Sequence, residues 1–454
     1  MNMLFRSDIQ ILRGFSVVIV FLYHLQIPGF ENGYLGVDIF FVLSGYLMAQ
    51  LYNQGSAFDF YKRRLKRLLP AYFVTIAITT FIVAFIAVPS DANQRFDRVW
   101  FDIIGMSNIA FWSENSYFDS AAFKPLLNLW SLGVELQYYL LVPLVLPFIH
   151  KRRWALFFMV LGSMIAAFIL TTISPKTSFF MMPFRVWEFL FGATVAWHFS
   201  NITDTRRTLL LSILLPAILI AIIFVYPVKE DNLTILYGHP GIASFLITLF
   251  SSLILLKPLH TIFSNSNLFG KLFCKIGDYS YSIYLTHFPI IVLVNYKIFE
   301  GTILGSSDIG TITLIVILTF FSSFFLFNYI EKIRSNKNFA KLFFYILLVS
   351  LLIFLISPSI NKYRFTDKQN LIFDAWTDKD IYRCGKLMRI SNPTETVCKI
   401  SIAENPKKVF LVGNSHADSV KKAFSNSMEQ SDISSYFYVA NNPLMTPQTS
   451  SFYI

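Results

Sequence analysis

Long apolar stretches recur along most of the chain, separated by short polar segments. A helix needs about 20 mainly apolar residues to cross a bilayer, and eleven stretches come close to this length. They lie at about 9–27, 34–52, 68–88, 129–149, 154–173, 179–199, 208–226, 240–256, 277–299, 309–330 and 342–358. The pattern predicts an all-α polytopic membrane protein: a bundle of about ten helices, then an eleventh transmembrane helix.

The composition supports this prediction. Of the 454 residues, 55% are hydrophobic and only 14% are charged, which excludes an ordinary soluble enzyme of this size. Three cysteines exclude a disulfide-rich scaffold, and the 19 Gly and 18 Pro are scattered without a period. The first apolar stretch contains Arg13 and His24 and is not followed by a small-residue cleavage site, so we expect a retained span rather than a signal peptide.

The net charge of +11 admits two explanations: a nucleic-acid partner or basic loops retained in the cytosol. With the N-terminus in the cytosol, 18 Lys and Arg fall in cytosolic segments and 5 in outer loops. This asymmetry predicts a cytosolic N-terminus and an exported C-terminal tail, and no nucleic-acid partner.

The tail, from about residue 359, is polar and contains Cys384 and Cys398. In an oxidising compartment these cysteines are expected to form a disulfide, which would stabilise the tail by roughly 3 kcal/mol. Cys274 lies on the cytosolic side and is expected to be an inert thiol. The apolar run 409–412 leads into Gly413-Asn414-Ser415-His416, which predicts the start of an α/β domain.

Ionisable residues inside apolar spans are costly and therefore mark functional candidates. Arg13 and His24 are eleven residues apart, close to three full helical turns, so they share one helix face about 16 Å apart. They can line one polar track at two depths of the membrane. In the alternative interpretation, Arg13 extends to the lipid headgroups and His24 bonds a neighbouring carbonyl.

The basic segment 60–72 offers a second candidate site. Arg64 and Arg67 lie three residues apart on one helix face, and their planar guanidinium groups suit phosphates on the cytosolic side. A basic cluster beside a membrane helix also binds anionic lipid or sets the topology, and both alternatives remain open at this point.

Further ionisable groups fall in other spans. Asp38 begins the second, Glu135 lies in the fourth beside Trp130 and Tyr138, and the remaining groups are Arg185, Glu188 and, near Tyr281, His287. A histidine, carboxylates and arginines facing inward are the parts needed for base-assisted group transfer with an anionic cofactor. No metal site is predicted.

Six motifs occur in a known order: Arg13 with His24, Gly36-Val37-Asp38 with Ser44-Gly45, the segment Tyr61 to Tyr72, Trp130-Ser131-Leu132 with Glu135, Arg185 with Glu188, and Tyr284-Leu285 with His287. In these motifs, residues 6–333 resemble acyltransferase family 3, membrane proteins that O-acetylate bacterial surface polysaccharides. The resemblance implies a transmembrane domain over 1–335 in the bacterial inner membrane. It also implies cytosolic acetyl-CoA as donor and a sugar hydroxyl outside as acceptor.

The resemblance gives the candidate residues roles as follows. His24, oriented by Asp38 or Glu135, is the general base or a transient acyl carrier. Arg13, Lys62, Arg63, Arg64 and Arg67 bind acetyl-CoA, and Trp130, Tyr138, Arg185, Glu188, Tyr281 and His287 form the substrate channel.

The tail shows a second, shorter resemblance, to the fusion of this family with an SGNH hydrolase-like domain. It implies an eleventh helix at 336–358, a linker with the cysteine pair at 359–408, and the N-terminal part of an SGNH-like domain at 409–454. Ser415 corresponds to the nucleophile of that domain. Only 39 residues follow Ser415, so we expect either a fragment of a longer protein or a vestigial second domain.

The acceptor is left open between lipopolysaccharide O-antigen, capsule, exopolysaccharide and peptidoglycan, with O-antigen placed first. A multi-span transporter and a glycan-binding membrane sensor are the alternative functions, although the two halves show no inverted repeat of the kind common in transporters. The oligomeric state is not predicted.

Overall fold

The computed structural model describes residues 6–52, 56–113, 123–198, 208–227, 234–256, 268–298, 301–302, 308–374, 397–401, 407–413 and 415–439. The chain divides into two compact units. The first lies within residues 1–361 and is helical, whereas the second consists mainly of residues 362–454 and contains a small sheet.

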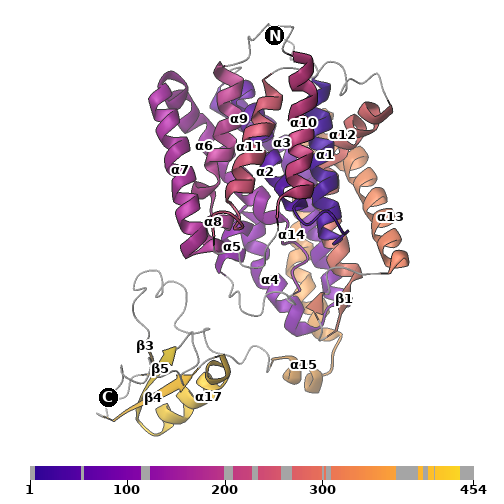
Figure 1. Cartoon of the computed structure of the whole chain (residues 1–454). Coiled ribbons are helices and arrows are strands. Elements are labelled where there is room, and N and C mark those ends of the chain that lie inside the picture. The colour runs from indigo at the N-terminus through magenta and orange to yellow at the C-terminus, as the bar shows by residue number, and fades with distance from the viewer. Residues whose placement is uncertain are drawn as a thin grey trace, which may run out of the picture. The chain divides into compact units, whose positions relative to one another are not determined.

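The first unit is a bundle in which most of the long helices run along one common direction (Figure 1). A helix occurs at each of the eleven predicted stretches: α1 Ser7–His24, α2 Gly36–Tyr52, α3 Ala57–Ile86, α6 Leu129–Lys151, α7 Arg153–Ile173, α9 Val186–His198, α10 Thr208–Val225, α11 Ile242–Leu255, α12 Leu268–Val294, α13 Ile309–Phe325 and α14 Phe339–Tyr363.

Shorter elements connect these helices: η1 Gly33–Leu35, α4 Pro89–Ile103, α5 Ser107–Ser113, α8 Pro175–Phe180, η3 Met182–Phe184, the strand pair β1 Tyr296–Lys297 and β2 Gly301–Thr302, the π-helical turn η4 Leu326–Ile330, and η5 Glu331–Ser335.

Several helices are suited to a membrane. Among the described residues, six helical segments are long and apolar enough to cross a bilayer, and three shorter ones are apolar. Helices α7 and α13, which lie at opposite flanks of the bundle in Figure 1, carry rows of exposed large apolar side chains, as does α14. Such surfaces are expected to face lipid. The chain is therefore a polytopic helical protein; the number of spans and their orientation remain predictions.

The boundaries of three predicted spans were wrong. The stretch predicted as one span at 179–199 is divided between the end of α8, η3 and α9, because Pro183 lacks the amide donor that a continuous helix needs. Helix α3 begins eleven residues before the predicted 68, and its N-cap Ser56 accepts a hydrogen bond from the Asp59 amide. Helix α12 begins nine residues before 277 and includes Lys271 and Lys275, whose long side chains can reach polar surroundings.

Two close helix crossings organise the core. At the crossing of α1 and α12, a Cβ on Gly14 would lie 2.3 Å from the Phe273 carbonyl oxygen, and one on Gly277 only 1.9 Å from that of Gln10. At the crossing of α2 and α9, Gly45 and Gly192 face the partner backbone in the same way. These contacts fit no larger side chain, so the glycines set the approach of the helices that carry the ionisable residues.

The second unit contains α15 Asp367–Asp374, β3 Val397–Ser401, β4 Lys408–Gly413, α17 Ser415–Gln430 and β5 Ser434–Val439. The sheet has the order β3-β5-β4, with β4 parallel and β3 antiparallel to β5. Strand β4, helix α17 and strand β5 thus form a βαβ unit, and the predicted α/β start at residues 409–416 is confirmed. The assignment of this unit as SGNH-like remains a prediction.

Candidate functional site

The bundle contains a cavity of about 730 Å³, including open solvent, that is lined by helices α1, α2, α3, α6 and α12 and that we call the arginine cavity. Its polar lining consists of Arg13, Ser44, Arg64, Arg67, Ser131, Glu135, Tyr139, Ser280, Tyr281 and Tyr284. Three of these are arginines and one is a glutamate, so the lining has an excess of positive charge.

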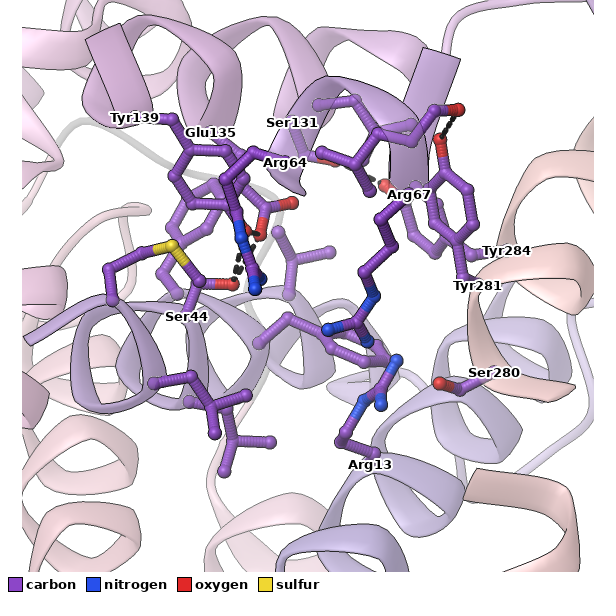
Figure 2. Close-up of a pocket in the computed structure, with 18 residues that line it drawn as sticks. Arg13, Ser44, Arg64, Arg67, Ser131, Glu135, Tyr139, Ser280, Tyr281 and Tyr284 are labelled. Carbon is purple, nitrogen blue, oxygen red and sulfur yellow. Dashed lines mark hydrogen bonds between the residues drawn. The ribbon is translucent and has the colours of Figure 1, made fainter. Parts of the chain in front are cut away.

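The three guanidinium groups point toward the same space (Figure 2). Among the described residues, the Arg13 side chain donates only to Gln10 Oε1, at 3.3 Å, and the buried Arg64 has no hydrogen-bond partner for its Nε. Within the described part of the chain, neither Arg13, Arg64 nor Arg67 forms an ion pair with a carboxylate. Arg64 is buried, and Arg13 and Arg67 are half-buried. Charges removed from water are normally paired, so this arrangement is typical of a binding site for an anion.

The glutamate of the cavity is held by hydroxyl groups rather than by arginine. Ser44 Oγ and Tyr139 Oη both donate to Glu135 Oε1 (Figure 2). Tyr281 Oη donates to the Leu68 carbonyl oxygen at 2.9 Å, which ties α12 to α3 at the cavity wall.

The structure divides the predicted cofactor-binding residues. Arg13, Arg64 and Arg67 line the arginine cavity, whereas Lys62 and Arg63 are exposed on α3 and lie outside its lining. They are only one or two residues away from Arg64, but helical geometry turns them toward another face.

The predicted channel residues are also divided. Tyr281 lines the arginine cavity, but Tyr138 does not: it stacks on Phe189 with ring centroids 4.2 Å apart. The next residue, Tyr139, takes the place expected for Tyr138. Trp130 lines a different cavity and packs on Phe179, at 4.3 Å between centroids.

This second cavity, the histidine cavity, has a volume of about 2330 Å³ including open solvent. Its lining includes His24, His239, many aromatic residues such as Trp130 and Tyr34, and the charged Glu31 and Lys176. Arg13 and His24 therefore line different cavities from one face of α1, which agrees with the predicted polar track at two depths.

His24 is paired with another histidine. His24 Nδ1 lies 3.1 Å from His287 Nε2, and His287 Nδ1 lies 3.0 Å from the Ile283 carbonyl oxygen. Because a carbonyl oxygen only accepts, His287 Nδ1 must donate to it. When both rings are neutral, His287 Nε2 then accepts from His24 Nδ1–H, which leaves His24 Nε2 unprotonated. The pair fixes His24 in the tautomer of a base.

The prediction that Asp38 or Glu135 orients His24 was wrong, because the side chain that contacts His24 Nδ1 is His287. Asp38 forms an ion pair with Arg185 Nη2 and a hydrogen bond, at 3.0 Å, with His239 Nε2. Arg185 Nε also lies 3.2 Å from Glu188 Oε1, and the side chains of Asp38, Arg185 and Glu188 are fully buried. We call these four residues the Asp38 cluster. The α2–α9 crossing brings Asp38 close to Arg185 and Glu188, and His239 comes from the segment before α11. Asp38 therefore neutralises Arg185 instead of contacting His24.

Arg185 and Glu188 therefore belong to the Asp38 cluster and line neither cavity. The guanidinium group of Arg185 also lies over the rings of Phe41 and Trp130, at 5.4 and 5.9 Å. The cluster connects α2, α9 and the segment before α11. One of its members, His239, also lines the histidine cavity.

Several residues that line the cavities were not predicted as site members. They include Ser44 and Tyr139, which hold Glu135, Tyr284, which lines both cavities, and His239, which links Asp38 to the histidine cavity. A histidine one residue before the apolar stretch 240–256 was a signal for the last of these. No sequence signal distinguished Tyr139 from Tyr138.

In the second unit, Ser415 is the first residue of α17, directly after β4, but its side chain lies outside the described residues. Its role remains a prediction. Cys398 on β3 is disulfide-bonded, whereas Cys274 is a free, buried thiol. Cys384, the predicted partner of Cys398, lies outside the described residues.

Comparison with known proteins finds several similar sequences. O-acetyltransferase OatA of Staphylococcus aureus is 34% identical over 323 residues, which cover 64% of this chain and 51% of the relative. Peptidoglycan O-acetyltransferase OatA of Listeria monocytogenes is 32% identical over 72% of this chain and 55% of the relative. Putative peptidoglycan O-acetyltransferase YrhL of Bacillus subtilis is 29% identical over 72% and 54%.

The chain spans about half the length of these curated relatives. No solved structure matches it. The family model described as "Acyltransferase domain" matches residues 6–328, which include the helices that line both cavities. The chain therefore belongs to acyltransferase family 3.

Proposed function

We propose that this protein is a membrane O-acetyltransferase that moves an acetyl group from cytosolic acetyl-CoA to a hydroxyl of a cell-surface glycan. The observation that supports this most strongly is the set of three arginines in the arginine cavity that form no ion pair within the described residues. One of them, Arg13, lies on the same face of α1 as His24, which is held in the tautomer of a base. An anion site and a base are what transfer from a phosphate-bearing donor requires.

The arginine cavity is proposed as the donor site. Arg13, Arg64 and Arg67 would bind phosphate groups of CoA, and the unpartnered Nε of Arg64 would find an acceptor there. The rise of α1 separates Arg13 from His24 by about 16 Å, comparable to an extended pantetheine arm. The thioester can thus reach His24 while the phosphates stay with the arginines.

The proposed reaction uses His24 as general base. The acceptor hydroxyl loses its proton to His24 Nε2 as its oxygen attacks the thioester carbonyl carbon. A C–O ester bond forms, the C–S bond breaks, and the CoA thiolate then takes up the proton from His24 Nε2. His287 holds His24 in the required tautomer throughout, because its Nδ1–H stays bonded to the Ile283 carbonyl.

The histidine cavity is proposed as the acceptor site. Its aromatic lining, which includes Trp130 and Tyr34 beside the polar Gln26 and Glu31, suits the apolar faces and hydroxyl edges of a sugar. Two of the relatives are named as peptidoglycan O-acetyltransferases, one of them as putative. We therefore propose peptidoglycan as the first acceptor to test, ahead of lipopolysaccharide O-antigen, which the sequence analysis had placed first.

We also propose an inner-membrane location with a cytosolic N-terminus. The asymmetry of Lys and Arg between loops supports it. With this orientation, the start of α3 lies on the cytosolic side. Arg64 and Arg67 are near that end of the helix, on the side where acetyl-CoA is made.

Radiolabelled acetyl-CoA supplied to membranes that contain the protein tests the proposal. Label should appear as an ester in the glycan fraction, and His24→Ala should reduce transfer by roughly 10²–10⁴-fold, the usual contribution of a general base. His150→Ala is a matched control, because His150 is exposed at the end of α6 and lines neither cavity. Label that crosses the membrane without becoming covalently bound would indicate a transporter, and glycan binding without transfer would indicate a sensor.

His287 provides a finer test of the tautomer argument. His287→Phe removes the acceptor for His24 Nδ1–H, whereas His287→Gln supplies a carbonyl oxygen in its place. We expect His287→Phe to lower kcat without changing KM for acetyl-CoA, and His287→Gln to retain more activity. Equal losses in the two variants would contradict the proposed role of His287.

A further inference from the structure

The arginine cavity and the histidine cavity share two lining residues, Val37 on α2 and Tyr284 on α12. Each of these side chains is only 6% exposed. Because both residues contribute to both linings, they lie between the two cavities. Val37 and Tyr284 therefore form part of the wall between the cavities.

The tyrosine side of this wall is held firmly in place. Tyr284 Oη lies 2.5 Å from Ser131 Oγ and donates to the Asn128 carbonyl oxygen at 3.0 Å. Asn128 Nδ2 in turn donates to the Tyr284 carbonyl oxygen at 2.7 Å. Both ends of Tyr284 are thus bonded to the start of α6, so its ring cannot turn aside without breaking hydrogen bonds.

The valine side has no such bonds. Val37 lies in the first turn of α2 and presents only its two methyl groups to the cavities. The width of any passage between the cavities is therefore set by a fixed ring on one side and a small branched side chain on the other.

This wall lies on the path that the proposed function requires. If CoA phosphates bind the arginines while the thioester reaches His24, then the acyl end passes Val37 and Tyr284 first. We propose that Val37 and Tyr284 determine which acyl groups are transferred, admitting acetyl and excluding longer chains. This inference rests on the proposed function. The same wall separates the thioester from water in the open histidine cavity until the acyl end enters.

Transfer from acetyl-CoA and butyryl-CoA to a peptidoglycan acceptor, compared in the same membranes, tests the inference. Val37→Ala should raise the ratio of butyryl to acetyl transfer roughly tenfold, within the range that one or two methylene groups contribute in an apolar pocket. Val37→Phe should lower transfer of both groups. Val42→Ala is the control, because Val42 is a fully buried valine on the same helix that lines neither cavity.

Tyr284→Phe tests the other side of the wall. It keeps the ring but removes the bonds to Ser131 and Asn128, so it should also raise the butyryl ratio. Tyr72→Phe is its control, since the buried Tyr72 hydroxyl likewise donates to a carbonyl oxygen, that of Asp102, at 2.7 Å, away from both cavities. Ratios equal to that of the unmodified protein in both Val37→Ala and Tyr284→Phe would overturn the inference.

If the protein transfers no acetyl group at all, the proposed function is refuted. A labelling experiment can still test whether Val37 and Tyr284 form a barrier between the two cavities. In a Cys274→Ala background, Leu47→Cys places a thiol in the arginine cavity. A membrane-impermeant methanethiosulfonate should label it from one face of a sealed vesicle only. Adding Val37→Ala with Tyr284→Ala should allow labelling from both faces. Labelling from both faces without these changes, or from one face with them, would show that these residues form no barrier.

Discussion

Arginine occurs in two opposite environments inside this bundle. Arg185 lies in the Asp38 cluster, within reach of two carboxylates and the rings of Phe41 and Trp130. Arg13, Arg64 and Arg67 lie in the arginine cavity, where the one carboxylate, Glu135, is bonded by hydroxyl groups.

The difference shows how to separate a structural charge from a functional one. A buried charge whose partners are all in the protein holds helices together, and its loss leaves those partners uncompensated. Buried charges without partners are costly in the free protein and are satisfied only when a ligand supplies the opposite charge. The predictions below test this division.

The largest effect on stability is expected for Arg185→Met. The change leaves Asp38 and Glu188 buried without their cation, and breaking a buried pair costs about 3–5 kcal/mol. The protein should lose folded yield and unfold at a much lower temperature in detergent. Arg64→Met is the matched control, and an equal loss in that variant would remove the distinction between the two environments.

Arg95→Met should have the next largest effect on stability. Arg95 pairs with Asp102 at 2.5 Å and also donates to Thr80 Oγ1, and its side chain is 4% exposed. Only one carboxylate is left uncompensated, so we expect a loss near the lower end of the range for buried pairs, about 3 kcal/mol. Thermal unfolding of the two variants, measured under the same conditions, tests this order of stability loss. A larger loss of stability for Arg95→Met than for Arg185→Met would contradict it.

Arg64→Met and Arg67→Met should affect the donor rather than the fold. Each removes a charge-assisted hydrogen bond to phosphate worth about 1.5–3 kcal/mol, so KM for acetyl-CoA should rise roughly tenfold or more. The unfolding temperature should not fall, because no carboxylate of the described residues loses an ion-pair partner. An unchanged KM in both variants would exclude these residues as phosphate ligands.

The smallest effect is expected for Lys62→Ala with Arg63→Ala. These exposed side chains belong to the same basic segment but lie outside the lining of the arginine cavity. KM for acetyl-CoA should change by about twofold or less at physiological salt, because screening weakens exposed charges. A rise as large as that for Arg67→Met would place the phosphates outside the cavity.

Much of the architecture could be predicted from the sequence. Apolar stretches of about 20 residues located the helices, because backbone groups in a membrane must be hydrogen-bonded within the segment. The spacing of Arg13 and His24 placed them on one face of α1, and the apolar run before Gly413 indicated a strand followed by a helix. The division of the predicted 179–199 span was not predicted, although Pro183 in the sequence was a signal for it.

Contacts between helices were not predictable from spacing along the chain. The partner of His24 is 263 residues away, and that of Asp38 is 147 residues away. A periodic pattern gives the face of a helix but not the helix opposite it. Asp38 and Glu135 were therefore expected beside His24, whereas His239, Ser44 and Tyr139 were not recognised as members of the site.

The sequence by itself determined which residue types enter the membrane and which helix faces carry them, since both follow from local geometry and the cost of burying charge. Only the tertiary structure decided which charges are neutralised within the protein and which are not. That depends on how closely α1 approaches α12 and α2 approaches α9 at their glycines, because ion pairs and hydrogen bonds form only over a few ångströms.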